Sequence, residues 1–272
     1  VSILCEAVDT GKKIRIVGDY DIDGVCSTYI LLQAFERLGS DVDFEIPDRI
    51  KDGYGINESI IEQAHADGVE VILTCDNGIS AFHQVELAKK YGMTVVITDH
   101  HEVPLDGEKE KIPPADAVID PKQADCPYPF PEICGAVVAY KLVQVLYARR
   151  GVPQMEWLDL LEFAAIATVG DVMKLQDENR ILVKYGLKKM AQTKNLGLRR
   201  LAEKNNLDLG AITAYHIGFV IGPCLNAGGR LKTAKEALAL LRAQSEEEAE
   251  RLAEELKELN DTRKDMTEQG TE

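Results

Sequence analysis

The chain has 272 residues, of which 45% are hydrophobic and 28% are charged, and its formal net charge is −15. This composition is typical of a globular protein with a sizeable core, and it excludes a disordered or fibrous chain. The negative charge excludes binding to duplex DNA through a globally basic surface, because such binding needs many Lys and Arg residues to displace counterions.

Several chain-wide features bear on where the protein works. Its six cysteines lie far apart without a CxxC pair, which favours free thiols in a reducing cytoplasm over a disulfide framework or a zinc cluster. No apolar run is long enough to cross a bilayer, and residues 1–13 lack the pattern of a secretory signal. The chain starts at Val1 without Met and ends inside a charged helical pattern. We therefore expect it to be a piece of a longer protein, with a second domain missing from it.

The first part of the chain, residues 1–130, alternates β-type apolar runs with helical patterns. We expect strands at 14–17, 42–46, 69–74, 94–98 and 117–119, and helices at 25–38, 57–66 and 80–91. Near-continuous Val, Ile and Leu runs that alternate with helices are typical of a parallel sheet covered on both faces. The predicted fold class is therefore α/β.

The pattern becomes helical after residue 130. We expect helices at 134–149, 155–169, 178–192, 196–205, 210–220 and 232–242. These form a predicted helical part at 131–243. In the last part, 244–272, leucines at helical spacing among many charges predict a long helix, either solvated or serving as a connector to the second domain.

Four clusters of acidic or histidine residues follow apolar runs. They are Asp19, Asp21 and Asp23 in DYDIDG, Asp76 in DNG, Asp99 with His100 and His101 in DHH, and Asp171 after FAAIATVG. If strand geometry continues past residue 17, the three acids of DYDIDG point to one side, because side chains alternate along a strand. Since ligands bind at the carboxyl ends of parallel strands, we expect the clusters to converge in one crevice.

This combination of residues predicts a metal centre. Clustered carboxylates repel one another unless a cation joins them. Carboxylates with imidazoles suit Mn²⁺ or Mg²⁺, and the histidines favour Mn²⁺. Two such ions about 4 Å apart can activate a water and stabilise the leaving oxygen of a phosphoester, so we predict a two-metal phosphodiesterase. Taken singly, DxDxDG also fits a calcium-type loop or a hydrated turn, and DNG an ordinary turn.

The motifs DYDIDG, DNG, DHH and VGDV stand in the order of the four motifs of the DHH phosphoesterases, which the chain resembles over about residues 14–265. The segments IPDRIKDGYG (46–55), CGAVVAYKL (134–142) and GPCLNAGGRL (222–231) are similar to those of the family's bacterial single-stranded-DNA-specific exonucleases. This resemblance implies hydrolysis of single-stranded DNA from the 5′ end to mononucleotides, with Mn²⁺ or Mg²⁺, in DNA repair and recombination. It also implies a second domain joined through a long helix.

The resemblance further implies a role for each motif residue. The implied metal ligands are Asp19, Asp21, Asp23, Asp76 as the bridge, His100 and Asp171. Asp19 can instead orient a ligand or a water. Asp99 would hold a histidine, and His101 would donate to the scissile phosphate. Some relatives have a histidine where this chain has Val17, which leaves the ligand set of the first metal open.

The expected substrate-binding residues are Arg230, Asn226 and Arg49. Gly228 and Gly229 would let the backbone approach the DNA strand. Tyr54 can stack on a base or simply pack. For Arg230, the simpler reading is an exposed side chain at a helix-terminal turn.

Two other functions compete with this reading. The same metal chemistry can serve a small substrate, namely a cyclic dinucleotide, a very short oligonucleotide or polyphosphate, which the acidic charge favours. A scaffold with a decayed site is the non-enzymatic alternative, but a complete acid and histidine set is costly to keep clustered without metal. An NTPase is disfavoured because the sequence has no GxxxxGK[ST] loop.

Overall fold

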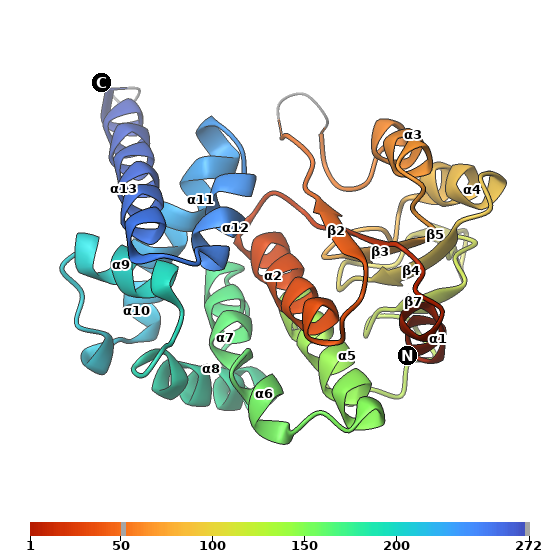
Figure 1. Cartoon of the computed structure of the whole chain (residues 1–272), viewed down its shortest axis with the longest axis horizontal. Coiled ribbons are helices and arrows are strands. Elements are labelled where there is room, and N and C mark those ends of the chain that lie inside the picture. Colours follow the sequence, from red (N-terminus) through yellow and green to blue (C-terminus); the bar gives the residue numbers. More distant parts are fainter. Residues whose placement is uncertain (50–52, 270–272) are drawn as a thin grey trace.

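The computed structural model describes residues 1–49 and 53–269 of the chain. Among these residues, five parallel strands form one sheet in the order β2-β1-β3-β4-β7 (Figure 1). The strands are β1 (Ile14–Val17), β2 (Val42–Glu45), β3 (Val71–Cys75), β4 (Thr94–Thr98) and β7 (Ala117–Ile119). The α/β prediction is confirmed. A small antiparallel pair, β5 (Leu105–Asp106) with β6 (Lys109–Glu110), was not predicted.

Helices cover both faces of the sheet, which explains why its strands are apolar on both sides. The main core lies on the side of α2 (Ile22–Arg37) and α5 (Gly135–Arg150), together with the unpredicted helix α1 (Ser2–Asp9). The second core lies under α3 (Glu58–Ala66) and α4 (Phe82–Lys90). Alternate residues of one strand enter different cores, as Ile16 and Val17 of β1 do.

The rest of the chain is mostly helical, as predicted, and lies beside the sheet at the left of Figure 1. Its helices are α6 (Gln154–Leu158), α7 (Leu161–Gly170), α8 (Asp177–Met190), α9 (Leu196–Lys204), α10 (Ala214–His216), α11 (Gly222–Leu231), α12 (Lys235–Arg242) and α13 (Glu246–Gln269). The single helix expected at 155–169 is two helices, α6 and α7. None of the helices in the described ranges combines the length and apolarity that a bilayer span requires.

The expected helix at 210–220 was wrong in its boundaries. A short 3-10 turn (Leu209–Ala211) precedes α10, and a π-helical turn (Ile217–Ile221) then joins α10 to α11. The segment GPCLNAGGRL, for which no helix was predicted, forms α11.

The glycines of α11 allow close contacts within the chain. A Cβ on Gly229 would lie 2.3 Å from the carbonyl oxygen of Tyr20, in the first acidic motif. A Cβ on Gly228 would lie 2.8 Å from the carbonyl oxygen of Thr233 and 3.4 Å from Leu256 of α13. The expectation that these glycines let the backbone approach the DNA strand is corrected, because the space beside them is filled by the protein itself.

The C-terminal helix α13 is only partly solvated. Ala249, Leu252, Ala253 and Leu256 are buried on its inner face, where it packs against α9, α11 and α12. Beside this contact, Glu246 and Glu250 make ion pairs with Arg200 and Lys204 of α9. Its first half is therefore an integral part of the helical layer.

Candidate metal centre

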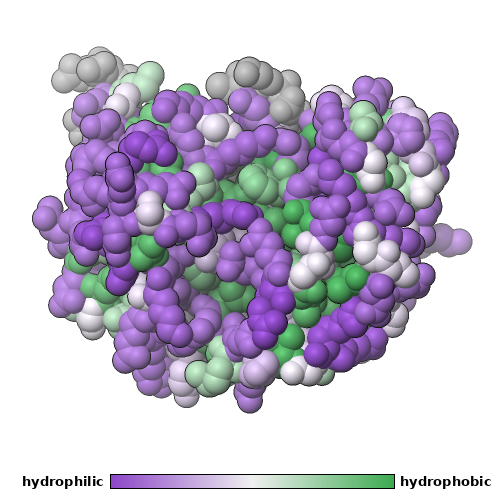
Figure 2. Space-filling model, in the orientation of Figure 1, coloured by the Kyte–Doolittle hydropathy of each residue, from purple (hydrophilic) through white to green (hydrophobic). Residues whose placement is uncertain are grey.

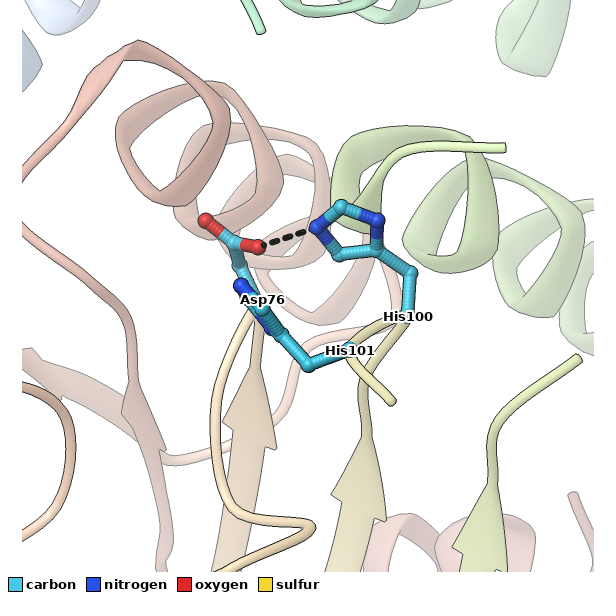
Figure 3. A group of neighbouring side chains, drawn as sticks. All are labelled: Asp76, His100 and His101. Carbon is cyan, nitrogen blue, oxygen red and sulfur yellow. Dashed lines mark ion pairs between the residues drawn. The ribbon is translucent and has the colours of Figure 1, made fainter. Parts of the chain in front are cut away.

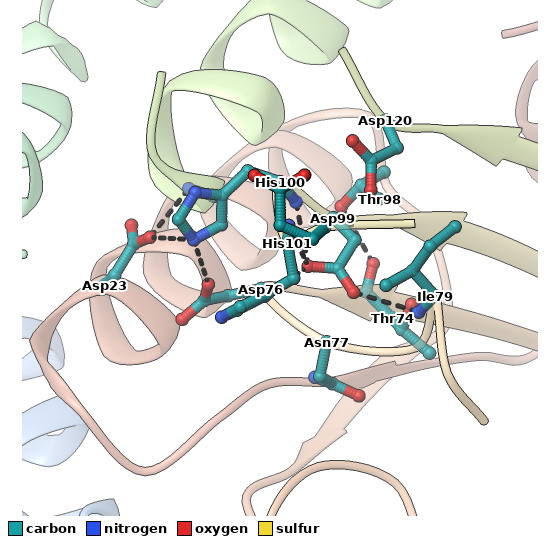
Figure 4. A network of polar contacts seen from close by, with 12 residues as sticks. Asp23, Thr74, Asp76, Asn77, Ile79, Thr98, Asp99, His100, His101 and Asp120 are labelled. Atoms are coloured by element: carbon teal, nitrogen blue, oxygen red, sulfur yellow. Dashed lines mark hydrogen bonds and ion pairs between the residues drawn. The ribbon is translucent and has the colours of Figure 1, made fainter. Parts of the chain in front are cut away.

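The predicted acidic and histidine residues meet at the carboxyl end of the sheet. Figure 3 shows Asp76, His100 and His101, and Figure 4 adds Asp23 and Asp99. They form three overlapping groups whose nitrogen and oxygen atoms lie within 4.8 Å of one another: Asp19, Asp21 and Asp76; Asp23, His100 and Asp171; and Asp76, His100 and His101. Asp76 and His100 each belong to two groups, so the groups form one continuous cluster.

The first motif differs from the strand-like arrangement expected for it. Strand β1 ends at Val17, and Asp21 is the N-cap of α2, where its Oδ1 accepts hydrogen bonds from the amides of Asp23 at 2.9 Å and Gly24 at 3.0 Å. Aspartate is a favoured N-cap because it satisfies amides that lack a helical partner. As a result, Asp23 lies in the helix and joins a different group from Asp19 and Asp21.

The carboxylate of Asp23 is held by the N-terminus of α5. It accepts hydrogen bonds from the amides of Gly135 at 2.6 Å and Ala136 at 2.7 Å. These amides and the helix dipole stabilise its negative charge. The segment CGAVVAYKL thus has a positioning role, which periodicity alone could not reveal.

Asp76 has an unusual backbone conformation, with φ at 61°, a region that residues other than glycine seldom adopt. The hydroxyl of Tyr54 donates to its carbonyl oxygen at 2.9 Å. The side chain of Asn77 ties the same turn to β1 by donating to the carbonyl oxygen of Val17 at 3.0 Å. Gly135 leaves room for Asp76, because a Cβ there would lie 2.7 Å from the Cβ of Asp76. The turn therefore fixes where this carboxylate points.

His100 faces three carboxylates. Its Nε2 lies 3.0 Å from Oδ1 of Asp76 (Figure 3), 3.4 Å from Oδ2 of Asp23 and 4.0 Å from Oδ2 of Asp171. Burial lowers the pKa of His100 and so favours the neutral imidazole, which is the form that binds metals.

Asp99 holds His101 in place. Its Oδ1 lies 2.7 Å from Nδ1 of His101, and its Oδ2 accepts a hydrogen bond from the amide of Ile79 at 2.9 Å (Figure 4). The hydrogen bond that the His101 ring donates to Asp99 raises the pKa of His101. Burial alone would raise the pKa of Asp99, but the hydrogen bond and the charge of His101 outweigh it and leave that pKa lowered. The side chain of His101 is 45% exposed, so it can reach a bound molecule.

The electrostatics of the cluster fit a divalent cation. Burial, and then repulsion from neighbouring acids, raises the pKa of Asp19 and that of Asp171 to about 7 and that of Asp76 well above its usual value. No described Lys or Arg makes an ion pair with the clustered carboxylates.

Two buried oxygens of the cluster also lack a donor. Oδ1 of Asp19 and Oδ1 of Asp76 accept no hydrogen bond from the described residues. The 3.0 Å contact of Asp76 with His100 has the distance of an ion pair but not the direction of a hydrogen bond. Carboxylate oxygens and imidazoles with such free positions are the donors that Mn²⁺ and Mg²⁺ accept.

The expected substrate-binding residues Arg49, Asn226 and Arg230 lie in two separate places. The guanidinium of Arg49 stands 5.4 Å from the ring centre of Tyr20, within the first motif. Asn226 and the exposed Arg230 of α11 line a small cavity of about 170 Å³, together with Arg263 of α13. Sequence reasoning missed Arg263, because one arginine in a densely charged helix carries no distinguishing pattern.

Comparisons with known proteins agree with this geometry. The sequence model described as "DHH family, N-terminal domain" matches residues 13–168. The single-stranded-DNA-specific exonuclease RecJ of Bacillus subtilis (strain 168) is 40% identical over 267 residues, which cover 98% of this chain and 33% of that protein.

Solved structures are similar as well. A crystal structure of exonuclease RecJ bound to manganese superposes with a TM-score of 0.87 at 35% identity, covering 98% of this chain and 66% of that one. For RecJ from Thermus thermophilus in complex with Mn²⁺, the TM-score is 0.83 at 34% identity, over 98% of this chain and 38% of that one. The chain spans about a third to a half of the length of the curated RecJ relatives. Since the matching family model covers more than half of the chain and includes its first three motifs, the chain belongs to the DHH family.

Proposed function

We propose that the chain is the catalytic part of a metal-dependent exonuclease that hydrolyses single-stranded DNA from the 5′ end to mononucleotides. The observation that carries this proposal is the meeting of five aspartates and two histidines in one cluster at the carboxyl end of the sheet. Similarity to RecJ proteins over nearly the whole chain supports the substrate, and the manganese in two of their structures supports the metal. A role in DNA repair and recombination is part of the same proposal.

The cluster has the donors for two divalent cations, Mn²⁺ or Mg²⁺. Asp19, Asp21 and Asp76 would hold one ion and Asp23, His100 and Asp171 the other, with Asp76 as the proposed bridge between them. When bound, such cations supply Lewis-acid activation of a water and of the phosphodiester.

The chain's own residues supply orientation and substrate contacts. Asp99 engages Nδ1 of His101, and Nε2 of the ring lies 3.2 Å from the hydroxyl of Tyr54. When DNA is bound, Nε2 would instead donate to a phosphate oxygen as negative charge develops on it. Arg49 and Arg230, with Asn226, would bind phosphates on either side of the cluster. A few local cations of this kind reconcile phosphate binding with a net charge of −15.

A DHH phosphodiesterase for small substrates is the second candidate, favoured by the same net charge. The discriminating experiment incubates the chain with Mn²⁺ and, in parallel, a 5′-phosphorylated single strand, the matching duplex, a cyclic dinucleotide and polyphosphate. We expect mononucleotides from the single strand at the highest rate. Faster hydrolysis of the cyclic dinucleotide or of polyphosphate would favour the second candidate.

A variant of the proposed bridge tests the metal centre directly. Asp76→Ala should abolish hydrolysis and weaken Mn²⁺ binding in calorimetry while the far-UV circular dichroism stays unchanged. The matched control is Asp106→Ala, which removes an exposed acid of β5 outside the cluster. Near-normal hydrolysis by Asp76→Ala would remove the bridge from the proposal.

We also propose a cytoplasmic location, which the six free cysteines support.

A further inference from the structure

A cavity distinct from the metal centre lies between helices of the chain. Its volume is about 430 Å³, and its walls come from α2, α5, α6, α7, α8, α9 and α12 and from the loops beside them. These helices meet on the face seen in Figures 1 and 2, which is hollowed near its centre and bordered by hydrophilic side chains. The clustered aspartates and histidines do not line this cavity.

Glu162 of α7 lines the cavity, and one of its carboxyl oxygens has no hydrogen-bond partner among the described residues. The residue is only 5% exposed, and its Oε1 accepts a hydrogen bond from the hydroxyl of Thr193 at 2.7 Å. Its Oε2 is buried and accepts no hydrogen bond from the part of the chain that the structure describes. Burial raises the pKa of Glu162. An unpaired carboxylate in such a position is costly, and a donor that enters the cavity would relieve that cost.

The cations around the cavity are already paired with acids. The ion pairs are Arg37 with Glu156, both Lys189 and Lys194 with Asp159, and Arg242 with Glu36. An anionic ligand would have to displace these carboxylates, whereas a cationic ligand finds the free oxygen of Glu162. The negative net charge of the chain also attracts cations.

The remaining walls suit an organic cation better than a metal ion. The rings of Tyr29 and Phe163 lie with their centres 4.3 Å apart beside Glu162, and aromatic faces attract ammonium and guanidinium groups. The hydroxyl of Tyr29 is held in place by Asn195, whose side-chain nitrogen donates to it at 3.1 Å. Glu162 belongs to none of the groups of three metal-binding side chains found in the described residues.

We propose that this cavity binds a small organic cation, whose primary ammonium or guanidinium group donates to the carboxylate of Glu162 and lies against Tyr29 and Phe163. The volume of the cavity is of the size that small-molecule sites have. This site is independent of the metal centre, so the nuclease proposal can fail without affecting it.

Calorimetric titration with putrescine and with agmatine tests the proposal. The titrations are run at about pH 8.5, where the carboxyl is ionised, and with saturating Mg²⁺ so that the metal centre is not available to the amines. We expect one site in the wild-type chain, with binding weakened about 10- to 100-fold in Glu162→Gln, because a hydrogen bond to a charged group is lost. The control Glu156→Gln removes a rim acid that is paired with Arg37 and should bind as the wild type does.

A second variant covers the case in which Glu162→Gln does not fold. Gln33→Trp places an indole in the cavity without altering Glu162, and it should abolish amine binding while hydrolysis of DNA stays unchanged. Absence of binding of both amines to the wild type at millimolar concentration would overturn the proposal. So would equal affinity in the folded Glu162→Gln or Gln33→Trp variant.

Discussion

Replacing Gly135 by alanine adds one methyl group next to the proposed bridging carboxylate. The new Cβ would lie 2.7 Å from the Cβ of Asp76 and 2.8 Å from its Oδ1, which is about 0.7 Å short of the 3.4 Å at which ordinary contact begins. Either Asp76 moves or the N-terminus of α5 moves, and that terminus holds Asp23 through two amide hydrogen bonds. In both cases the cluster changes its geometry.

The size of this steric overlap determines how much activity and stability Gly135→Ala should lose. A misplacement of about 1 Å in an active site can cost about 100-fold in rate, so we expect kcat/KM to fall roughly 10- to 100-fold. Overpacking of this kind should lower the free energy of unfolding by about 1–3 kcal/mol, which leaves a chain of this size folded. Initial rates on a labelled single strand with saturating Mn²⁺ measure the first effect, and urea unfolding measures the second.

Gly186→Ala is the matched control for general packing damage. A Cβ on Gly186 would lie 2.2 Å from the Cβ of Ala165, in the contact between α7 and α8 and outside the metal cluster. This variant should lose at least as much stability and yet keep its rate within about threefold. If Gly135→Ala hydrolyses DNA like the wild type, or if both variants lose the same activity, the proposed role of Asp76 geometry is refuted.

Three further changes have separate readouts. His101→Ala should slow turnover by about 100-fold or more with little change in Mn²⁺ affinity, because it removes a donor to the phosphate and not a proposed metal ligand; a parallel loss of metal binding would contradict this. Arg230→Ala should weaken capture of a single strand several-fold at unchanged Mn²⁺ affinity, and unchanged DNA affinity would exclude that contact. Glu162 should lower stability at high pH, because burial raises its pKa from 4.5 to about 7 in the folded chain, so that this state holds the proton more tightly than the unfolded state does. Its contribution is fully present below about pH 4.5 and is lost as the pH rises through 7. This contribution to the free energy of unfolding amounts to about 3 kcal/mol. Urea unfolding of the wild type and of Glu162→Gln between pH 4.5 and 7 measures it, because the difference between their unfolding free energies should change by that amount. A difference that does not depend on pH would refute the prediction.

The sheet could be predicted because its signal is local. Runs such as IRIV and TVVIT are buried on both sides, so the strands at 14–17 and 94–98 have the predicted bounds. The arrangement of the acids within DYDIDG could not be predicted by extending the strand, since Asp21 instead caps a helix. An Asp two residues before Asp-Gly is itself an N-cap signal, which competes with the alternation of strands.

The parts of the site that could not be predicted from the sequence depend on contacts between residues far apart in the chain. The amides that hold Asp23 come from residues 135 and 136, more than a hundred positions further along the chain. GPCLNAGGRL was expected to meet DNA with its glycines, but Gly229 is required by the carbonyl of Tyr20. Glu162, inside the apolar run LEFAAIATVG, was not singled out, because its meaning depends on a cavity formed by helices distant in sequence.

Through the contacts of its glycines, α11 connects α13 with the first acidic motif. Gly229 rests on the peptide between Tyr20 and Asp21, and Gly228 faces Leu256 of α13. Because packed interiors transmit displacement with little compliance, a tilt or slide of α13 would be passed through α11 to the loop that carries Asp19 and Asp21. A displacement of α13 would thus change the distances between the acidic side chains of the cluster without contacting them.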